Sequence, residues 1–194
     1  MKTVRGLEAA LAALHDFARE NPRARIAIDG RCAAGKTTLA ARFAAETGAA
    51  LFHMDDFFLR PVQRTPARYA QPGGNIDHER FLDEVLQPLC RGEQVIYRPF
   101  DCASQTLKPA VTAASAPLAV VEGSYALHPA LRGAYDLRVF VTARLPVRLA
   151  RLRRRDPARL DAFVERWIPL EERYFAGCAV EACCDMLADT SDDV

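Results

Sequence analysis

Residues 30–37 read Gly-Arg-Cys-Ala-Ala-Gly-Lys-Thr, a complete match to the phosphate-binding pattern GxxxxGK[ST]. The two glycines allow a tight loop whose backbone N–H groups converge on phosphate oxygens, and the N-terminus of a following helix adds a positive end. Lys36 would reach the β- and γ-phosphates, and the Thr37 hydroxyl would ligate Mg²⁺. The pattern therefore predicts a site for ATP and Mg²⁺ formed by Gly30, Arg31, Cys32, Ala33, Ala34, Gly35, Lys36, Thr37 and Thr38.

Acidic residues follow three short apolar runs of the sequence, at Asp29, at Asp55 with Asp56, and at Glu122. If these runs are parallel strands, their carboxyl ends meet at one edge of the sheet, where ligands bind. One carboxylate could orient or deprotonate an attacking hydroxyl, and another could hold the metal with its water shell. The sequence contains no NKxD guanine-recognition run, which favours a kinase over a GTPase. ATP versus GTP as the phosphate donor is left open.

Strands and helices that would position these residues alternate along the chain. Apolar spacing and turn residues predict helices over 7–18, 35–47, 77–89, 146–155 and 158–175, the last with an interruption at Pro169. Short apolar runs predict strands over 25–29, 50–54, 117–121, 137–141 and 186–188, a β element over 94–100, and a loop or edge hairpin over 107–116. The alternation indicates an α/β domain over residues 1–194, a three-layer P-loop NTPase fold with a five-stranded parallel sheet.

Composition excludes several classes of protein. The 26 basic and 25 acidic residues nearly cancel, so a broadly basic nucleic-acid-binding surface is not expected. No apolar stretch is long enough to span a membrane, and the N-terminus lacks the apolar core of a signal peptide. The six scattered cysteines read as reduced thiols, with a zinc site as the minor alternative. We expect a cytoplasmic protein with a small-molecule substrate and neither nucleic acid nor membrane as a partner, and we leave a homo-oligomer open.

Several motifs in order carry a family resemblance. The phosphate-binding loop is followed by Met54-Asp55-Asp56-Phe57-Phe58, Asn75-Ile76-Asp77-His78, Tyr97-Arg98-Pro99-Phe100-Asp101, Val120-Val121-Glu122-Gly123 and an Arg-rich helix. This order resembles the uridine kinase branch of the P-loop nucleoside kinases, whose relatives include phosphoribulokinase and pantothenate kinase. The resemblance spans roughly residues 25 to 189.

The resemblance implies roles for individual residues. Asp55 would activate the substrate 5′-hydroxyl, with Asp56 as the rival base, and Glu122 would join Thr37 at Mg²⁺. Asp77 would bind the ribose hydroxyls, and Tyr97 and Phe100 could stack on the base. The alternatives are a metal-ligating or capping Asp55, a helix-capping Asp77, an arginine-paired Glu122, and core positions for the two aromatics. Gln105 stands where the family has a histidine that reads the pyrimidine, which leaves the base open.

Arginines crowd residues 144–159, and Arg148, Arg151 and Arg155 share one helix face by their spacing. They resemble lid arginines that close over the triphosphate, which predicts a short lid over about 144–160. Arg151 and Arg155 would stabilise the moving charge, and Arg148 would contact substrate. The alternative is a solvated basic face.

The expected function is ATP- and Mg²⁺-dependent phosphoryl transfer to the 5′-hydroxyl of a nucleoside, with uridine preferred. One alternative is a kinase of another small hydroxyl metabolite, such as pantothenate or a sugar. The other is an ATP-binding regulatory protein without transferase activity.

Overall fold

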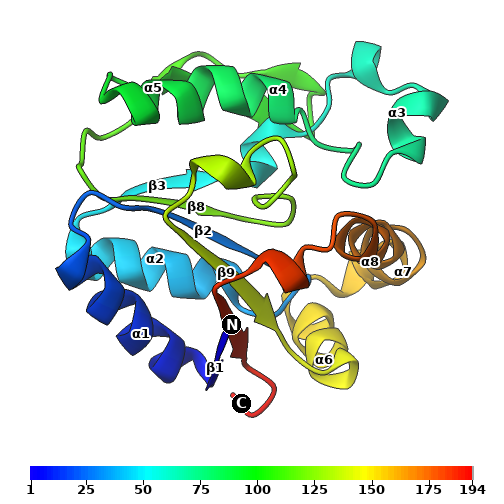
Figure 1. Ribbon diagram of the computed structural model, residues 1–194. Helices are drawn as coiled ribbons and strands as arrows, with labels where there is room; N and C mark the ends of the chain where they lie inside the picture. Colours follow the sequence, from blue (N-terminus) through cyan, green and yellow to red (C-terminus); the bar gives the residue numbers. More distant parts are fainter. Residues whose placement is uncertain (194) are drawn as a thin grey trace.

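A fully parallel sheet of six strands forms the centre of the molecule, in a computed structural model that describes residues 1–193 (Figure 1). The strands lie in the order β1-β10-β9-β2-β8-β3. Their bounds are β1 (Lys2–Arg5), β2 (Arg25–Gly30), β3 (Ala50–His53), β8 (Ala119–Glu122), β9 (Leu137–Thr142) and β10 (Met186–Asp189). The carboxyl ends of β2, β3 and β8 therefore meet at one edge, as the strand-end acids require.

Each face of the sheet packs against its own apolar core. On one face Ile26 and Ile28 of β2 pack with helices α1 (Leu7–Glu20) and α2 (Lys36–Thr47). On the other face Ala27 belongs to a second core, which includes Phe52, Phe81, Val85, Val121, Phe140, Tyr174 and Phe175. Burial on both faces explains why the central strands are apolar at nearly every position.

The expected five-stranded sheet is wrong by one strand. The additional strand is β1, which pairs with β10 at the edge of the sheet. Its sequence, Lys-Thr-Val-Arg, is mostly exposed and carries no apolar alternation. A short polar edge strand gives almost no periodic signal, so its position is fixed only by the neighbouring strand.

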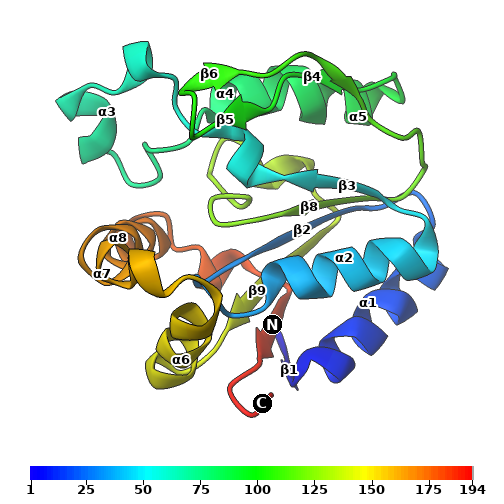
Figure 2. The same cartoon turned by 180° about the vertical axis from the view of Figure 1, so that it is seen from behind.

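A second layer covers β3 and β8 and contains helix α4 (His78–Phe81), a π-helical turn over Leu82–Leu86, and helix α5 (Gln87–Arg91). Together they occupy the range of the single helix expected there. The expected β element and hairpin form two short antiparallel pairs, whose strands lie beside α4 and α5 in Figure 2. One pair joins β4 (Ile96–Tyr97) to β7 (Val111–Thr112), and the other joins β5 (Phe100–Asp101) to β6 (Thr106–Leu107).

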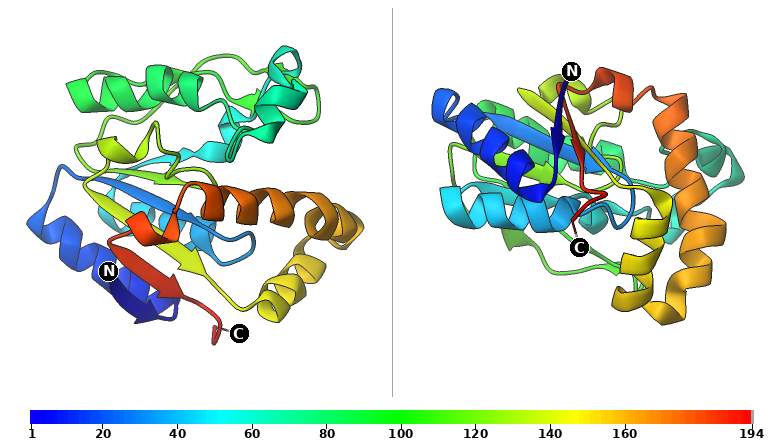
Figure 3. Two further views of the ribbon diagram at one scale, coloured as in Figure 1. Left: turned by 45° about the vertical axis from the view of Figure 1, so that its right-hand side comes forward. Right: turned by 90° about the horizontal axis from the view of Figure 1, so that it is seen from below.

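Residues 145–177, which we call the helical flank, cover one end of the sheet. The flank consists of α6 (Leu145–Arg155), α7 (Leu160–Ala162), a π-helical turn over Phe163–Trp167 and α8 (Ile168–Gly177). Figure 3 shows α8 running from the outer end of α7 back towards the sheet. Pro169 follows the π-helical turn at the start of α8 and does not interrupt the helical run. No helix within residues 1–193 is long and apolar enough to cross a membrane.

Candidate active site

A cleft of about 920 Å³ lies between the phosphate-binding loop, the ends of β3 and β8, and the helical flank. Its wall includes residues 32–38 of the loop, which lie between β2 and α2. It also includes Asp55 after β3, Glu122 at the end of β8, and Arg151 and Arg155 of the flank. The topology therefore brings together most of the residues that the sequence selects for nucleotide and metal binding.

The loop approaches its neighbours closely at Gly30. A Cβ atom at this position would lie 2.0 Å from the carbonyl oxygen of Val141, so a larger residue would displace the backbone of β9. Gly35 has a φ of 101° and precedes α2, a conformation that glycine adopts without steric cost. The Arg31 side chain forms two hydrogen bonds to Glu172 of α8, at 2.9 and 3.2 Å. Gly30 and Arg31 thus position the loop, and neither is among the described residues that line the cleft.

Lys36, Thr37 and Glu122 form the polar floor of the cleft. Lys36 Nζ donates hydrogen bonds to the carbonyl oxygens of Gly30 and Arg31, at 2.7 and 3.1 Å. Thr37 Oγ1 donates to Glu122 Oε2 at 3.1 Å, and His53 Nδ1 lies 2.6 Å from Glu122 Oε1. The Glu122 carboxylate raises the pKa of His53. The partners of Glu122 are therefore the Thr37 hydroxyl and the His53 imidazole, and not an arginine, the alternative raised by the sequence.

The Thr37 and Glu122 oxygens fit a magnesium site. Mg²⁺ prefers oxygen donors, takes one or two protein ligands and keeps several waters or phosphate oxygens. Across residues 1–193 no group of three or more His, Cys, Asp or Glu side chains could hold a metal by itself. The pair is thus suited to an ion that arrives with a nucleotide rather than to a permanently bound metal.

Asp55 and Asp56 are adjacent in sequence and separated in space. Both belong to a 3₁₀ turn over Met54–Phe57, and only Asp55 is found in the cleft wall. Desolvation raises the pKa of Asp55, and the negative charge of Glu122 adds to the effect, although Lys36 opposes it. Asp56 Oδ2 instead accepts a hydrogen bond from the Tyr97 hydroxyl at 3.2 Å. The geometry favours Asp55 over Asp56 as the group that could contact a substrate hydroxyl.

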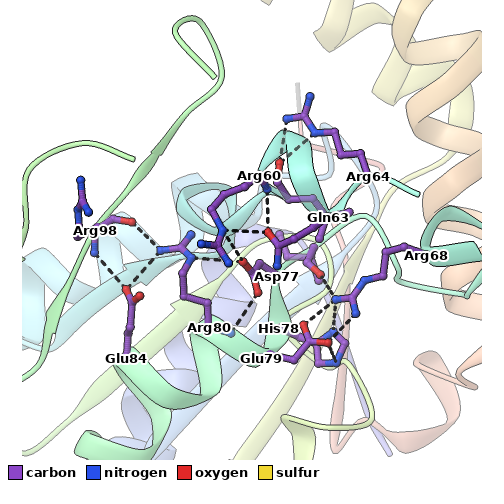
Figure 4. Close-up of polar contacts among 12 residues, drawn as sticks. Arg60, Gln63, Arg64, Arg68, Asp77, His78, Glu79, Arg80, Glu84 and Arg98 are labelled. Atoms are coloured by element: carbon purple, nitrogen blue, oxygen red, sulfur yellow. Dashed lines mark hydrogen bonds and ion pairs between the residues drawn. The ribbon is translucent and has the colours of Figure 1, made fainter. Parts of the chain in front are cut away.

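Asp77 is enclosed in a cluster of charged residues beside the cleft (Figure 4). It is 1% exposed, and its Oδ1 accepts a hydrogen bond from the backbone N–H of Arg80, which caps α4. Its Oδ2 lies 3.7 Å from Arg60 Nε and 3.6 Å from Arg80 Nε. Asp77 is absent from the described lining of the cleft, so the capping alternative describes its position in this structure.

The two aromatic residues expected at a base also lie in the core. Phe100 is 4% exposed, and the Tyr97 ring stacks on Phe57 with a centroid separation of 5.4 Å. Neither occurs among the described lining residues. The aromatic residues that do line the cleft are Phe58, Tyr69, Tyr125, Phe163 and Trp167, which the sequence reasoning did not select as ligands. Phe58 and Tyr125 follow predicted strands, whereas Tyr69, Phe163 and Trp167 carry no sequence signal for a ligand role.

The three arginines on one face of α6 have different surroundings. Arg151 donates to the carbonyl oxygen of Ala33 at 3.2 Å and to Thr190 Oγ1 at 3.0 Å, so it fixes the loop to the segment after β10. The Arg155 guanidinium lies 5.5 Å above the Phe163 ring and lines the cleft. Arg148 is buried, donates to the carbonyl oxygen of Ala143 at 3.1 Å and lies outside the described lining.

Two acids that the sequence reasoning left without a role tie the site together. Asp29, at the end of β2, accepts hydrogen bonds from the Tyr174 hydroxyl and from the N–H groups of Gly30, Tyr125 and Leu127. Full burial raises its pKa to about 6 in spite of these donors. Glu171 of α8 accepts hydrogen bonds from the Cys32 N–H at 2.9 Å and from Ser124 Oγ at 2.6 Å. Both acids connect the loop to α8.

Solved structures of kinases share this fold. A candidate uridine kinase from Bacillus stearothermophilus has a TM-score of 0.67 and 19% identity, covering 93% of this chain and 100% of that chain. A candidate fructose transport system kinase from Silicibacter sp. TM1040 has a TM-score of 0.68 and 26% identity, covering 91% and 98%. YFH7 from Saccharomyces cerevisiae, described as a P-loop kinase candidate with a circular permutation, has a TM-score of 0.61 and 11% identity, covering 97% and 99%.

No family model matches the sequence, and no curated protein matches it. The assignment therefore rests on the fold and on the site. The structural neighbours indicate phosphoryl transfer of the P-loop kinase type, and the loop, strand order and cleft agree with it. In its fold, this chain is similar to P-loop kinases, among them the Bacillus and Silicibacter proteins.

Proposed function

We propose that this protein is an ATP- and Mg²⁺-dependent kinase that transfers the γ-phosphoryl group to a hydroxyl of a small molecule. The observation that carries the proposal is that Lys36, Thr37, Glu122 and Asp55 line one cleft. Phosphoryl transfer depends mainly on positioning and on electrostatic stabilisation, and these four residues supply groups for both.

Each group has a distinct role in the proposed reaction. The loop N–H groups and Lys36 bind the phosphates, and Thr37 and Glu122 hold Mg²⁺, which when bound neutralises phosphate charge. Asp55 accepts a hydrogen bond from the acceptor hydroxyl, and its raised pKa suits a proton acceptor. The bond from the γ-phosphorus to the bridging oxygen breaks, the bond to the acceptor oxygen forms, and the hydroxyl proton passes to Asp55. Arg155 and Arg151 stabilise the charge in transfer.

For the acceptor we propose a nucleoside 5′-hydroxyl, with uridine preferred. The order of the sequence motifs supports this choice, as does the similarity to the Bacillus protein described as a uridine kinase candidate. The positions of Asp77, Tyr97 and Phe100 do not support it, because Asp77 and Phe100 are buried and none of the three lines the cleft. If a nucleoside binds, other residues of the cleft must contact its sugar and base.

A sugar or another small hydroxyl compound is the second candidate acceptor. The enclosed positions of Asp77 and Phe100 favour it, since they leave the cleft without the expected ribose and base contacts. The similar Silicibacter structure, described as a fructose transport system kinase candidate, supports a sugar.

The test is ADP release measured against a panel of nucleosides, sugars and pantothenate, with ATP and Mg²⁺ fixed. Acceptor-dependent ADP release, with a phosphate ester identified by mass spectrometry, is the expected result. ATP binding without acceptor-dependent release would instead favour a regulatory protein without transferase activity. Response to sugars alone would reject the nucleoside.

A further inference from the structure

One wall of the cleft carries polar groups that the nucleotide does not account for. We call Arg64, Tyr69, Asn75, Gln105 and Arg166 the acceptor wall; all five line the cleft. Arg166 belongs to the helical flank, and the other four come from the segment after β3 and from the β5–β6 hairpin. None belongs to the phosphate-binding loop or its helix, so these residues are available for a second ligand in the cleft.

Arg64 is held in a fixed orientation without a carboxylate partner. Its Nε and Nη2 both donate to the carbonyl oxygen of Leu59, at 3.0 and 2.9 Å, and its guanidinium lies 5.6 Å from the Phe100 ring centre. Figure 4 shows Arg64 apart from the Asp77 cluster, in which Arg60, Arg68 and Arg80 meet acids. Across residues 1–193 no carboxylate lies within ion-pair distance of Arg64 or Arg166. Arg64 Nη1 makes no hydrogen bond among the described residues, so this guanidinium keeps donors free for a ligand.

Asn75 adds a second unsatisfied group to the same wall. The residue is 7% exposed, and its Nδ2 has no hydrogen-bond partner within residues 1–193. The amide lies beside the Tyr125 hydroxyl without the geometry of a hydrogen bond. Leaving a buried donor unpaired is costly, so such a group in a cleft wall points to a ligand oxygen.

The charges of Asp55 and Arg64 both act on Cys102, a third residue that lines the cleft. Burial raises the pKa of the Cys102 thiol, Asp55 raises it further, and Arg64 and Arg159 oppose both. These charges therefore surround one corner of the cleft. Lys36 and six arginines line the cleft as a whole, against the four acids Asp55, Glu122, Glu171 and Asp193. The proposed reaction uses Lys36, Arg151 and Arg155 at the phosphates, and it gives Arg64 and Arg166 no role.

We propose that the acceptor is an anionic hydroxy compound whose carboxylate or phosphate group binds Arg64, with Asn75 donating a hydrogen bond to the same molecule and Arg166 approaching from the flank. This inference rests on the proposed kinase function and narrows its acceptor from any hydroxyl compound to a negatively charged one, so it replaces neutral uridine as the preferred acceptor. A planar guanidinium with free N–H groups matches either anion by paired hydrogen bonds.

The experiment compares each neutral acceptor with related acceptors that carry an anionic group. The sets are glycerol with glycerate and glycerol 3-phosphate, glucose with gluconate and glucose 6-phosphate, and uridine with orotidine. ADP release gives kcat/KM, and calorimetry with a non-hydrolysable ATP analogue gives the Kd of each compound. At least one anionic member should exceed its neutral partner by about 10- to 100-fold, the effect of one charge-assisted contact. The carboxylate and phosphate members distinguish the two anions.

Arg64→Gln should raise the KM of that anionic acceptor by about 10- to 100-fold and leave the KM of ATP within about twofold. Arg64→Lys keeps the charge and loses the planar guanidinium. The KM of the anionic acceptor should therefore lie between the values for the wild type and Arg64→Gln, which would show that the loss in Arg64→Gln is not a folding defect. Arg153→Gln is the matched control, because Arg153 is exposed on α6 outside the described lining. Preference for the neutral members, or an Arg64→Gln effect on ATP alone, would overturn the inference and leave the kinase proposal standing. Failure of every anionic member to bind would also overturn it, whereas loss of ATP binding would contradict the proposed function itself.

Discussion

The phosphate-binding loop and the acceptor wall line the same cleft, yet they are held by different kinds of contact. The loop is shaped by its own backbone, with Gly30 against β9 and Gly35 at the start of α2. The acceptor wall is shaped by side chains from distant segments, such as Arg64 and Arg166. A ligand site formed by backbone groups of one loop can be predicted from a short sequence motif. A site formed by side chains from distant segments depends on the whole fold.

Asp55 is the residue on which both regions depend, because the acceptor hydroxyl must meet the γ-phosphate beside it. Asp55→Asn removes the proton acceptor while keeping the shape of the side chain, so kcat should fall by about 10²- to 10⁴-fold. ATP binding, measured by calorimetry, should persist. Asp56→Asn is the matched control and should keep kcat within about fivefold, since it weakens only one hydrogen bond, to Tyr97. Equal losses in the two variants would contradict the assignment.

The variant Asp77→Ala tests whether Asp77, expected from the sequence to bind substrate, has a structural role instead. Asp77→Ala removes the cap of α4 and one of the two acids beside the buried guanidinium of Arg80, which keeps Glu84, so the free energy of unfolding should fall by about 1–3 kcal/mol. The acceptor KM of the folded protein should not change. Urea denaturation and steady-state kinetics measure the two effects.

Glu93→Ala, which also removes an acidic side chain, is the stability control for Asp77→Ala. Its exposed ion pair with Arg91 should contribute no more than about 1 kcal/mol. A large rise in acceptor KM for Asp77→Ala, with stability close to that of Glu93→Ala, would restore Asp77 to the substrate site and weaken the contrast between the two regions.

Asp29 should give the protein a distinctive pH dependence. Its folded pKa, about 6, lies above the unfolded value near 3.8, so folding favours the protonated acid. The resulting stability is complete below about pH 3 and is lost as pH rises through 6, a total change of about 3 kcal/mol. The difference in free energy of unfolding between the wild type and Asp29→Asn should shift by about 2 kcal/mol between pH 4 and 7, against the wild type. A difference independent of pH would contradict the raised pKa.

Local patterns were sufficient for most of the fold. Each central strand and each long helix has a periodic apolar signal, and the expected ranges agree with the structure to within a few residues. β1 was missed because its polar residues are ordered only by pairing with β10. The strands β4 to β7 were predicted only as a β element over 94–100 and a loop or hairpin over 107–116, because two-residue strands have no detectable periodicity.

The candidate site was predictable where one segment supplies the chemistry. Lys36, Thr37, Asp55 and Glu122 follow from a loop motif and from the ends of parallel strands, which any such sheet brings together. Asp77 and Phe100 could not be placed, because a capping aspartate and a core phenylalanine have the same sequence signature as ligands. Arg64 gave no signal, and Asn75 was noted only as part of a motif, since their importance lies in missing partners that only the structure reveals.

Phe58 and Phe100 offer the smallest and most discriminating comparison between core and cleft. Phe100→Leu is a moderate change in a packed core and should cost about 1 kcal/mol of stability, with the acceptor KM within about twofold. Phe58→Leu changes a residue that lines the cleft, so the acceptor KM should rise by about three- to tenfold with little loss of stability. Denaturation curves and kinetics with the best acceptor of the panel measure both.

Stacking on a base predicts the reverse result for this pair. Loss of an aromatic platform under a base costs about 1–3 kcal/mol of binding, which would raise the acceptor KM of Phe100→Leu by about 5- to 150-fold. That outcome would require Phe100 to leave its buried position when the acceptor binds, because it is now packed beneath Arg64. Movement of Phe100 would remove its ring contact with Arg64 but not the hydrogen bonds of Arg64 to Leu59, so a large Phe100→Leu effect together with a small Arg64→Gln effect would favour a base over an anion in the cleft.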